Sequence, residues 1–181
     1  IDSVSKIVNL FCKLGVKKLI ICNSSGCLNK GWDIGDIMYI NGCIDYSFTS
    51  KITPQITFNN KLQKNNIDQI IRGVAVDLDI NIRMGAYVWV TGPSYETPSE
   101  ILDMIKLGGG AVGMSTYPEI SRAIELGLDV YGLALLTNYA SGITSNKLTH
   151  KEVVENANLN IKKLENSIYK LIKSLRKEFD E

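Results

Sequence analysis

The chain has 181 residues and a formal net charge of +1 at pH 7, with 22% of its residues charged. One domain with a full-sized core fits this length, and so balanced a charge gives no basis for binding nucleic acid or a membrane surface. The four cysteines form no C-x-x-C pair and only one histidine is present, which argues against a metal site. No apolar run is long enough to span a bilayer. The cysteine pattern and the lack of a signal peptide favour a reducing, cytoplasmic compartment.

The hydrophobic pattern predicts helices and strands that alternate along the whole chain. Helices are expected at residues 3–14, 98–107, 118–126 and 149–177, and mixed signals favour a further helix at 65–78. Strands are expected at 18–22, 36–40, 83–91, 111–114 and 130–137, with a polar loop at 23–29 and irregular chain at 44–64. This alternation is typical of a mostly parallel central sheet flanked by helices, here in a single α/β domain spanning residues 1–181.

Two polar segments at expected strand ends are candidate anion sites. Asn23-Ser24-Ser25-Gly26 follows the strand at 18–22, and small residues of this kind let backbone N–H groups approach an anion closely. Gly113-Met114-Ser115-Thr116 ends another strand and precedes a helix, whose N-terminus favours an anion. The alternatives are an ordinary surface loop for the first segment and N-capping of the next helix by Ser115 or Thr116 for the second.

The segment Gly92-Pro93-Ser94-Tyr95-Glu96-Thr97 is the most informative stretch of the sequence. It follows a strand pattern, and the Thr-Pro-x-Glu sequence that begins at Thr97 signals the start of a helix. Glu96 is therefore expected beyond the carboxyl end of a strand, where α/β proteins bind ligands, beside the ring of Tyr95. A carboxylate here could accept hydrogen bonds from a flat polar ligand, or it could serve only as a partner of the helix dipole.

Two more polar side chains stand at element ends. Asn138 ends an apolar run and offers both a donor and an acceptor, although a turn-forming Asn is the commoner case. His150 lies in the first turn of the last helix, where the helix dipole disfavours its protonated form; its alternative reading is an exposed polar residue. The glycines from Gly108 to Gly113 match G-x-G-x-x-G in letters, but they follow a helix and open a strand, which excludes a dinucleotide-binding fingerprint. Gly113 is instead expected where another part of the molecule comes close to the backbone.

Taken together and in this order, the motifs resemble those of the trimeric purine nucleoside phosphorylases that cleave inosine and guanosine. The resemblance covers nearly the whole chain from Leu14 onward, in several spaced motifs. The matching strings are Asn23–Asn29, Gly35–Met38, Val90–Thr97, Ala111–Thr116, Pro118-Glu119, Thr137-Asn138, and His150 with Glu152-Val153.

At the matching positions, the resemblance implies a role for each side chain. Glu96 is expected to bind N1–H and any 2-amino group of a 6-oxopurine, and Asn138 to bond N7 and the region of O6; these two are the expected catalytic residues. The other expected contacts are Tyr95 near sugar and base, Met114 under the ribose, Tyr87 at a ribose hydroxyl, His150 at the 5′-hydroxyl, and Ser115 with the backbone at Ser24 for phosphate.

The resemblance also implies the reaction, which is phosphorolysis of purine ribonucleosides and deoxyribonucleosides in purine salvage. Inorganic phosphate is then a co-substrate, no metal or other cofactor is expected, and the chain is expected to form a homotrimer. A carboxylate at position 96 accepts from the N1–H that adenine lacks, and the NH₂ of Asn138 can donate to O6 where an aspartate would repel it. The pair therefore favours 6-oxopurines over adenine.

The chain departs from the family at its beginning. Family members carry a further N-terminal segment with a glycine-rich phosphate loop and an Arg-x-His-x-Tyr-like strand, and neither occurs here. We therefore expect a phosphorylase-like fold truncated at the N-terminus, with fewer strands and a half-built phosphate site. Two alternatives remain open: a non-catalytic purine-binding fragment or subunit, and a nucleosidase that uses water in place of phosphate.

Overall fold

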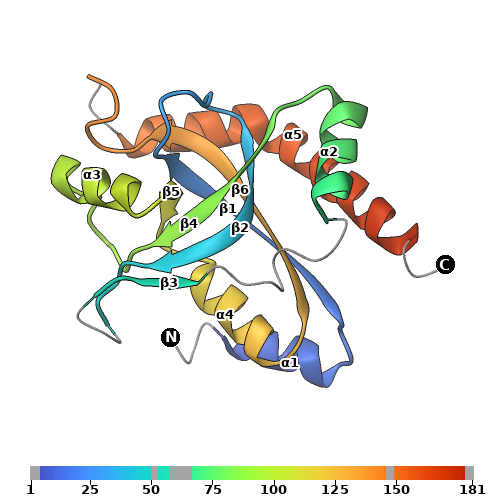
Figure 1. Cartoon of the computed structure of the whole chain (residues 1–181). Coiled ribbons are helices and arrows are strands. Elements are labelled where there is room, and N and C mark those ends of the chain that lie inside the picture. Colours follow the sequence, from blue (N-terminus) through green and yellow to red (C-terminus); the bar gives the residue numbers. More distant parts are fainter. Residues whose placement is uncertain (1–4, 50–52, 58–66, 146–148, 178–181) are drawn as a thin grey trace.

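The computed structural model of the chain describes residues 5–49, 53–57, 67–145 and 149–177 (Figure 1). It contains helices α1 (Lys6–Lys13), α2 (Ile67–Leu78), α3 (Pro98–Lys106), α4 (Tyr117–Glu125) and α5 (His150–Lys177). The strands are β1 (Lys18–Cys27), β2 (Ile37–Asp45), β3 (Gln55–Thr57), β4 (Ile82–Trp89), β5 (Gly109–Gly113) and β6 (Asp129–Tyr139). None of the helices in these ranges is long and apolar enough to cross a membrane.

The strands form one mixed sheet in the order β3-β2-β4-β5-β1-β6. Parallel pairing joins β2 to β4, β4 to β5 and β1 to β6, and the β1–β6 and β2–β4 registers are the longest in the sheet. Antiparallel pairing joins β1 to β5, β2 to β3 and β2 to β6. The expected α/β fold with a mixed, mostly parallel sheet is confirmed, but the pairing of β2 with β6 also closes the sheet into a ring, which the sequence did not predict.

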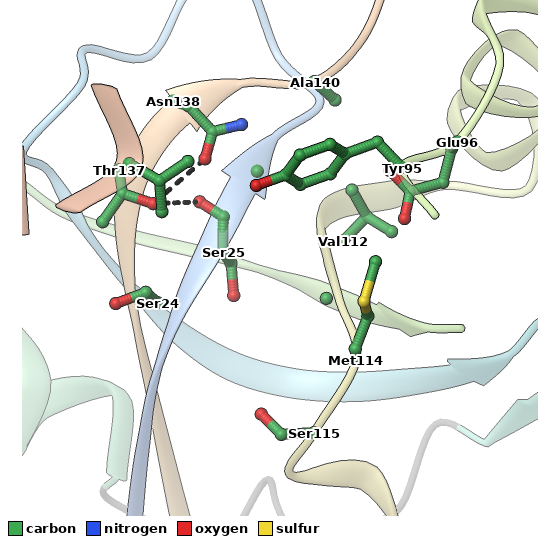
Figure 2. Close-up of a pocket in the computed structure, with 13 residues that line it drawn as sticks. Ser24, Ser25, Tyr95, Glu96, Val112, Met114, Ser115, Thr137, Asn138 and Ala140 are labelled. Carbon is green, nitrogen blue, oxygen red and sulfur yellow. Dashed lines mark hydrogen bonds between the residues drawn. The ribbon is translucent and has the colours of Figure 1, made fainter. Parts of the chain in front are cut away.

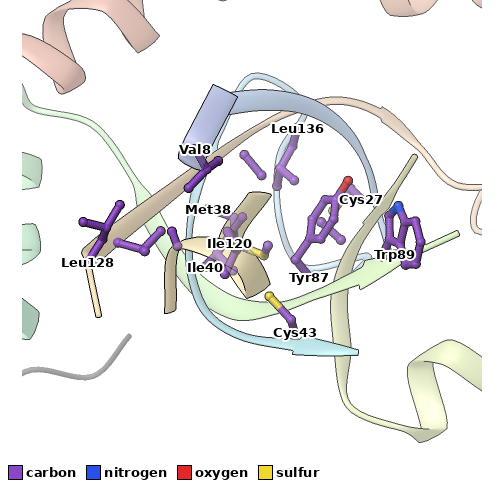
Figure 3. Close-up of a cluster of buried hydrophobic side chains, with 14 residues drawn as sticks. Val8, Cys27, Met38, Ile40, Cys43, Tyr87, Trp89, Ile120, Leu128 and Leu136 are labelled. Carbon is purple, nitrogen blue, oxygen red and sulfur yellow. The ribbon is translucent and has the colours of Figure 1, made fainter. Parts of the chain in front are cut away.

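Alternating side chains of the sheet pack against different helices. Met38 and Ile40 of β2 belong to a buried cluster that is covered by α1 and α4, whereas Ile37 and Tyr39 belong to a second cluster under α2 and α5. Figure 3 shows the first cluster, with the Tyr87 ring inside the curve of the sheet. The third cluster lies between the sheet and α3. When both faces of a strand are covered, its successive side chains are all buried and its sequence is a continuous apolar run. The sequence of β6 shows this pattern.

Local signals in the sequence explain where the helices begin. Thr97 caps α3, and its side chain and that of Glu100 bond each other's backbone N–H groups in a capping box. Thr149 caps α5 by accepting a hydrogen bond from the Glu152 N–H at 3.2 Å. The cap at Thr97 was predicted, and both caps fix the entry of two helices that border the pocket described below.

The prediction of a loop at residues 23–29 is wrong for its first five residues. Residues 23–27 continue β1, paired in parallel with β6. Asn, Ser and Gly have low strand propensity, so the sequence reads as a loop, but the neighbouring strand β6 supplies the backbone partners that local propensity cannot reveal. Among the described residues, β1 pairs only with β6 from Lys18 to Ser25, and β5 joins its other side at Gly26. Within the expected irregular segment, β2 runs on to Asp45 and β3 forms a short strand.

Closure of the ring depends on Gly132, which pairs with Ile40 across the β2–β6 contact. A Cβ at Gly132 would lie 2.9 Å from the Ile40 Cβ, so we expect Gly132→Ala to destabilise the fold by about 1–3 kcal/mol through overpacking. Gly73 in α2 is the matched control, because a Cβ there meets nothing within 4 Å. Gly73→Ala should stabilise the protein by roughly 0.5–1 kcal/mol through helix propensity. Urea unfolding of the two variants measures both, and equal effects would contradict this role for Gly132.

Candidate functional site

A pocket of about 260 Å³ opens where three strands end (Figure 2). The strand β1 contributes residues 24–26, β5 and the turn after it contribute 112–115, and the end of β6 contributes Thr137 and Asn138. Tyr95 and Glu96 reach it from the turn before α3. The structure therefore brings together the four polar segments that the sequence singled out, although the ligand assigned to each of them stays a prediction.

Glu96 forms one wall of the pocket and is partly shielded from solvent. Burial raises the pKa of its carboxyl above the usual range, a hydrogen bond from its own backbone N–H opposes this rise, and the charge of Glu100 adds to it. Gly92, with a φ of 67°, lets this turn approach the strand-end turn closely, because a Cβ there would collide with the Met114 sulfur. The acid is thus held against the pocket by a turn that packs on Met114.

Tyr95 and Met114 give the pocket its apolar surface. Both side chains are exposed, at 44% and 38%. The Tyr95 ring points from its turn across the pocket (Figure 2). Its hydroxyl lies 3.5 Å from Nδ1 of His150, in the first turn of α5. His150 therefore stands at the rim of the pocket beside Tyr95, and an exposed aromatic face of this kind can take up a flat ligand.

Asn138 is 4% exposed, and its amide is held by its neighbours. Its Oδ1 accepts from the Thr137 hydroxyl at 3.0 Å, and its Nδ2 donates to the Tyr139 carbonyl at 3.1 Å. The Thr137 carbonyl in turn accepts from Asn156 of α5 at 2.8 Å. An amide has two N–H groups and two lone pairs, so each end of the Asn138 amide keeps one hydrogen bond for a ligand in the pocket.

Hydroxyl groups dominate the other side of the pocket. Ser24 and Ser115 are both exposed to it, and Ser115 Oγ lies 3.2 Å from the Thr116 hydroxyl. The helix α4 begins at Tyr117, directly after this turn, so its N-terminus adds a favourable field for an anion. In the described part of the chain, no Lys, Arg or His lines the pocket. Any anion bound here would depend on hydroxyl and backbone donors.

Tyr87 does not line the pocket, and its expected contact with a ribose hydroxyl stays a prediction. The side chain is 0% exposed, and its hydroxyl accepts from the Ser115 N–H at 3.4 Å. A Cβ at Gly113 would lie 2.5 Å from that hydroxyl, which confirms Gly113 as a close backbone approach. Burial raises the pKa of the Tyr87 phenol well above its usual range. Tyr87 therefore supports the Ser115 backbone from behind.

The sequence placed Asn23, Ser25 and Thr116 in candidate anion segments, but it did not predict the contacts between them. Asn23 donates to the Thr116 hydroxyl at 2.7 Å, and Ser25 donates to Asn23 Oδ1 at 2.6 Å. Thr116 was expected in a candidate anion segment or, alternatively, as a helix cap; no cap bond of its side chain forms, and its φ is 75°. Nothing in the sequence signals a contact across 93 positions or a left-handed threonine. The one available signal for these contacts was the residue type of Asn23, whose amide can both donate and accept hydrogen bonds.

Comparison with protein families gives one match over most of the chain. The family model described as the phosphorylase superfamily matches residues 2–173. Purine nucleoside phosphorylase 1 of Geobacillus stearothermophilus is 36% identical over 162 residues, which cover 85% of this chain and 59% of the relative. Purine nucleoside phosphorylase 1 of Bacillus subtilis is 32% identical over 187 residues, which cover 99% of this chain and 68% of the relative. The chain thus spans about three fifths to two thirds of the length of these relatives.

Solved structures give the same result. Schistosoma mansoni purine nucleoside phosphorylase in complex with inosine has a TM-score of 0.83 and 26% identity, and the match covers 94% of this chain and 66% of the other. A Schistosoma purine nucleoside phosphorylase in complex with guanosine has a TM-score of 0.78 and 26% identity, covering 96% and 68%. The likeness therefore extends over nearly all of this chain and about two thirds of each neighbour.

The partly desolvated carboxylate of Glu96 predicts a pH-dependent cost to stability. Because its pKa is raised in the folded state, the fold disfavours the ionised form of Glu96. The contribution of this carboxyl to the free energy of unfolding is therefore fully present below the unfolded pKa and is lost as the pH rises through the folded pKa. We expect Glu96→Gln to be more stable than the parent protein at pH 7, with a difference that vanishes below a pH of about 4. Denaturant unfolding at several pH values measures this difference.

Glu155→Gln is the matched control for this comparison. Glu155 is exposed and lies 3.7 Å from Lys151 in an i,i+4 pair. Its removal should give no gain in stability at any pH, because solvent screens such pairs. Equal stability of the Glu96 variant and the parent protein at neutral pH would show that the pocket does not desolvate this carboxylate.

Proposed function

The chain belongs to the phosphorylase superfamily, and from this premise we propose that it cleaves 6-oxopurine ribonucleosides and deoxyribonucleosides by phosphorolysis. The products are the free purine base and ribose or deoxyribose 1-phosphate, a reaction of purine salvage. One observation carries the proposal: Glu96 and Asn138 reach a single pocket from different elements, with Tyr95 between them (Figure 2). This arrangement supports recognition of the polar edge of a flat base that offers both donors and acceptors.

Base recognition follows from the two side chains. The Glu96 carboxylate is suited to accept from N1–H, and from a 2-amino group where one is present. The free N–H of the Asn138 amide can donate to O6 or N7, while the buried bonds to Thr137 and Tyr139 hold the amide plane in place. Preorganised donors of this kind stabilise charge that develops on a leaving group. Met114 and Tyr95 supply the apolar contacts to ribose and base.

The chemical step needs no protein nucleophile. An oxygen of phosphate attacks C1′ of the sugar while the C1′–N9 bond breaks, and the bonding electron pair leaves on the purine. The purine takes up a proton from water, so that hypoxanthine or guanine is released neutral. The sugar becomes cation-like as its bond to the base breaks, and the negative phosphate stabilises it from the face opposite the base. Asn138 contributes by donating to the purine as its negative charge grows.

Phosphate is proposed to bind on the hydroxyl side of the pocket. Ser115, the backbone at Ser24 and the N-terminus of α4 offer donors there. His150 is proposed to bond the 5′-hydroxyl of the sugar, with Tyr95 beside it. Tyr87 is proposed to support the Ser115 turn. We further propose that the active protein is a cytoplasmic homotrimer and that it uses no cofactor.

The lining of the pocket also favours two alternative functions. No Lys, Arg or His lines it within the described residues, so the phosphate side lacks a full positive charge. A protein with this pocket could bind the purine base without turning over the nucleoside, or could hydrolyse it with water as a nucleosidase. The three functions differ in their dependence on phosphate and in the sugar product.

Incubation of the protein with inosine, with and without phosphate, separates the three functions. Phosphorolysis predicts hypoxanthine release that requires phosphate and yields ribose 1-phosphate. Release without phosphate, with free ribose as the product, would identify a nucleosidase. Binding of hypoxanthine without any release from inosine would identify a base-binding protein and contradict the proposed reaction.

Exchange of one amide tests the assignment of Asn138. Asn138→Asp replaces the donor near O6 by an oxygen, so inosine cleavage should fall at least tenfold relative to adenosine cleavage, on the order of one lost hydrogen bond to a charged group. The ratio of the two rates is the readout, because any general loss of folding lowers both rates equally. Asn29→Asp is the matched control, since Asn29 accepts from the Gly31 N–H in an exposed turn away from the pocket. An unchanged ratio would show that Asn138 does not read the base.

A further inference from the structure

The turn that carries Ser115 has a strained backbone. Thr116 has φ 75° and ψ −44°, and the Tyr117 N–H donates to the Ser115 carbonyl at 2.8 Å across it. These values describe a γ-turn of the rare kind, which is unfavourable for any residue and most of all for a β-branched one. Such a conformation persists only where the surrounding structure holds it in place. Contacts with neighbouring side chains must therefore hold the backbone of Thr116 in this conformation.

Asn23 of β1 makes one such contact. Its Nδ2 donates to the Thr116 hydroxyl at 2.7 Å, and its Oδ1 accepts from the Ser25 hydroxyl at 2.6 Å. Thr116 is 2% exposed and Ser25 is 3% exposed, so water cannot readily replace these bonds. Asn23 thus ties the end of β1 to the turn after β5, the two segments that form the hydroxyl side of the pocket.

The direction of these hydrogen bonds extends to Ser115. An amide NH₂ can only donate, so the Thr116 oxygen accepts from Asn23 and its own hydrogen is free to point elsewhere. Ser115 Oγ lies 3.2 Å from that oxygen and can accept this hydrogen. The Ser115 hydroxyl hydrogen is then left to point into the pocket as a donor. Chains of hydrogen bonds aligned in one direction strengthen each other, which makes the last donor a better partner for an anion.

We propose that Asn23 is a positioning residue for the phosphate side of the pocket, a role that rests on the proposed function. It holds the strained turn at Thr116 and sets the direction of the hydrogen bonds, so that the Ser115 hydroxyl and the backbone around it face a phosphate as donors. The row of hydrogen bonds through Ser25, Asn23, Thr116 and Ser115 takes over part of the role that positively charged side chains would have in holding a phosphate. Asn23 itself does not touch the nucleoside or the base.

Asn23→Asp tests the direction of the bonds with almost no change in shape. An aspartate cannot donate to the Thr116 oxygen, so the Thr116 hydrogen turns towards the carboxylate and the Ser115 hydrogen turns towards Thr116. The affinity for inorganic phosphate, measured by calorimetry on the whole chain, should fall at least tenfold, about the effect of one hydrogen bond to a charged group. The affinity for hypoxanthine should stay within twofold, because Glu96 and Asn138 are not part of this network. In turnover, the KM for phosphate should rise while the KM for inosine stays constant.

Substitutions at Thr116 separate the hydrogen bond from a general structural effect. Thr116→Val keeps the shape and the strain but removes the hydroxyl, so it should weaken phosphate binding as Asn23→Asp does. The double variant should be no weaker than either single one, because both act through the same bond. Thr116→Ser keeps the hydroxyl and should lose less affinity than Thr116→Val. Equal losses of phosphate and hypoxanthine affinity in Asn23→Asp would indicate a merely structural role and overturn the inference.

The outcomes also separate this inference from the proposed function. If the parent protein cleaves inosine with phosphate and Asn23→Asp leaves the KM for phosphate unchanged, the inference is wrong and the function stands. If phosphate binding depends on Asn23 but inosine is never cleaved, the function is wrong and the inference stands. If the parent protein binds no inorganic phosphate, both are wrong.

Discussion

The site depends on the place where β1 meets two strands at once. Up to Ser25, β1 pairs only with β6 in the described part of the chain, and at Gly26 its register shifts and β5 joins its other side. A Cβ at Gly26 would lie 3.3 Å from both Asn138 Nδ2 and Val112 Cγ1, so a larger residue would push these side chains away from their present positions. Because the three strands converge here, the ends of β1, β5 and β6 face one another, and their polar residues line one pocket.

The pocket has two sides with different physical character. On one side, a carboxylate with a raised pKa, an amide and an aromatic ring suit a flat polar ligand. On the other, neutral hydroxyl groups and a helix N-terminus suit an anion without any fully charged partner. Each side carries a cost to the fold: a partly desolvated carboxylate on the first and a left-handed threonine on the second. Costs of this kind gather at functional sites, where the surrounding structure compensates for them.

Local signals allowed much of the fold and half of the site to be predicted from the sequence. The cap signal at Thr97 predicted the start of α3, the apolar run predicted β6, and polar residues at strand ends pointed to Glu96, Asn138 and Ser115. The extension of β1 through residues 23–27 was missed because its strand partner is distant in the sequence. The burial of Tyr87 and the conformation of Thr116 were missed for a related reason: each depends on packing against a segment that the local pattern does not contain.

The central claim is that one pocket holds a purine base on its Glu96–Asn138 side and a phosphate on its Ser115 side. A crystal structure of the chain with hypoxanthine and inorganic phosphate measures this directly. We expect the base against Tyr95 and Met114, with its polar edge on Glu96 and Asn138, and the phosphate on Ser115 and the backbone at Ser24. A base bound elsewhere on the molecule, or a phosphate held only in the separate groove lined by Lys6, Lys13 and Arg122, would contradict this placement.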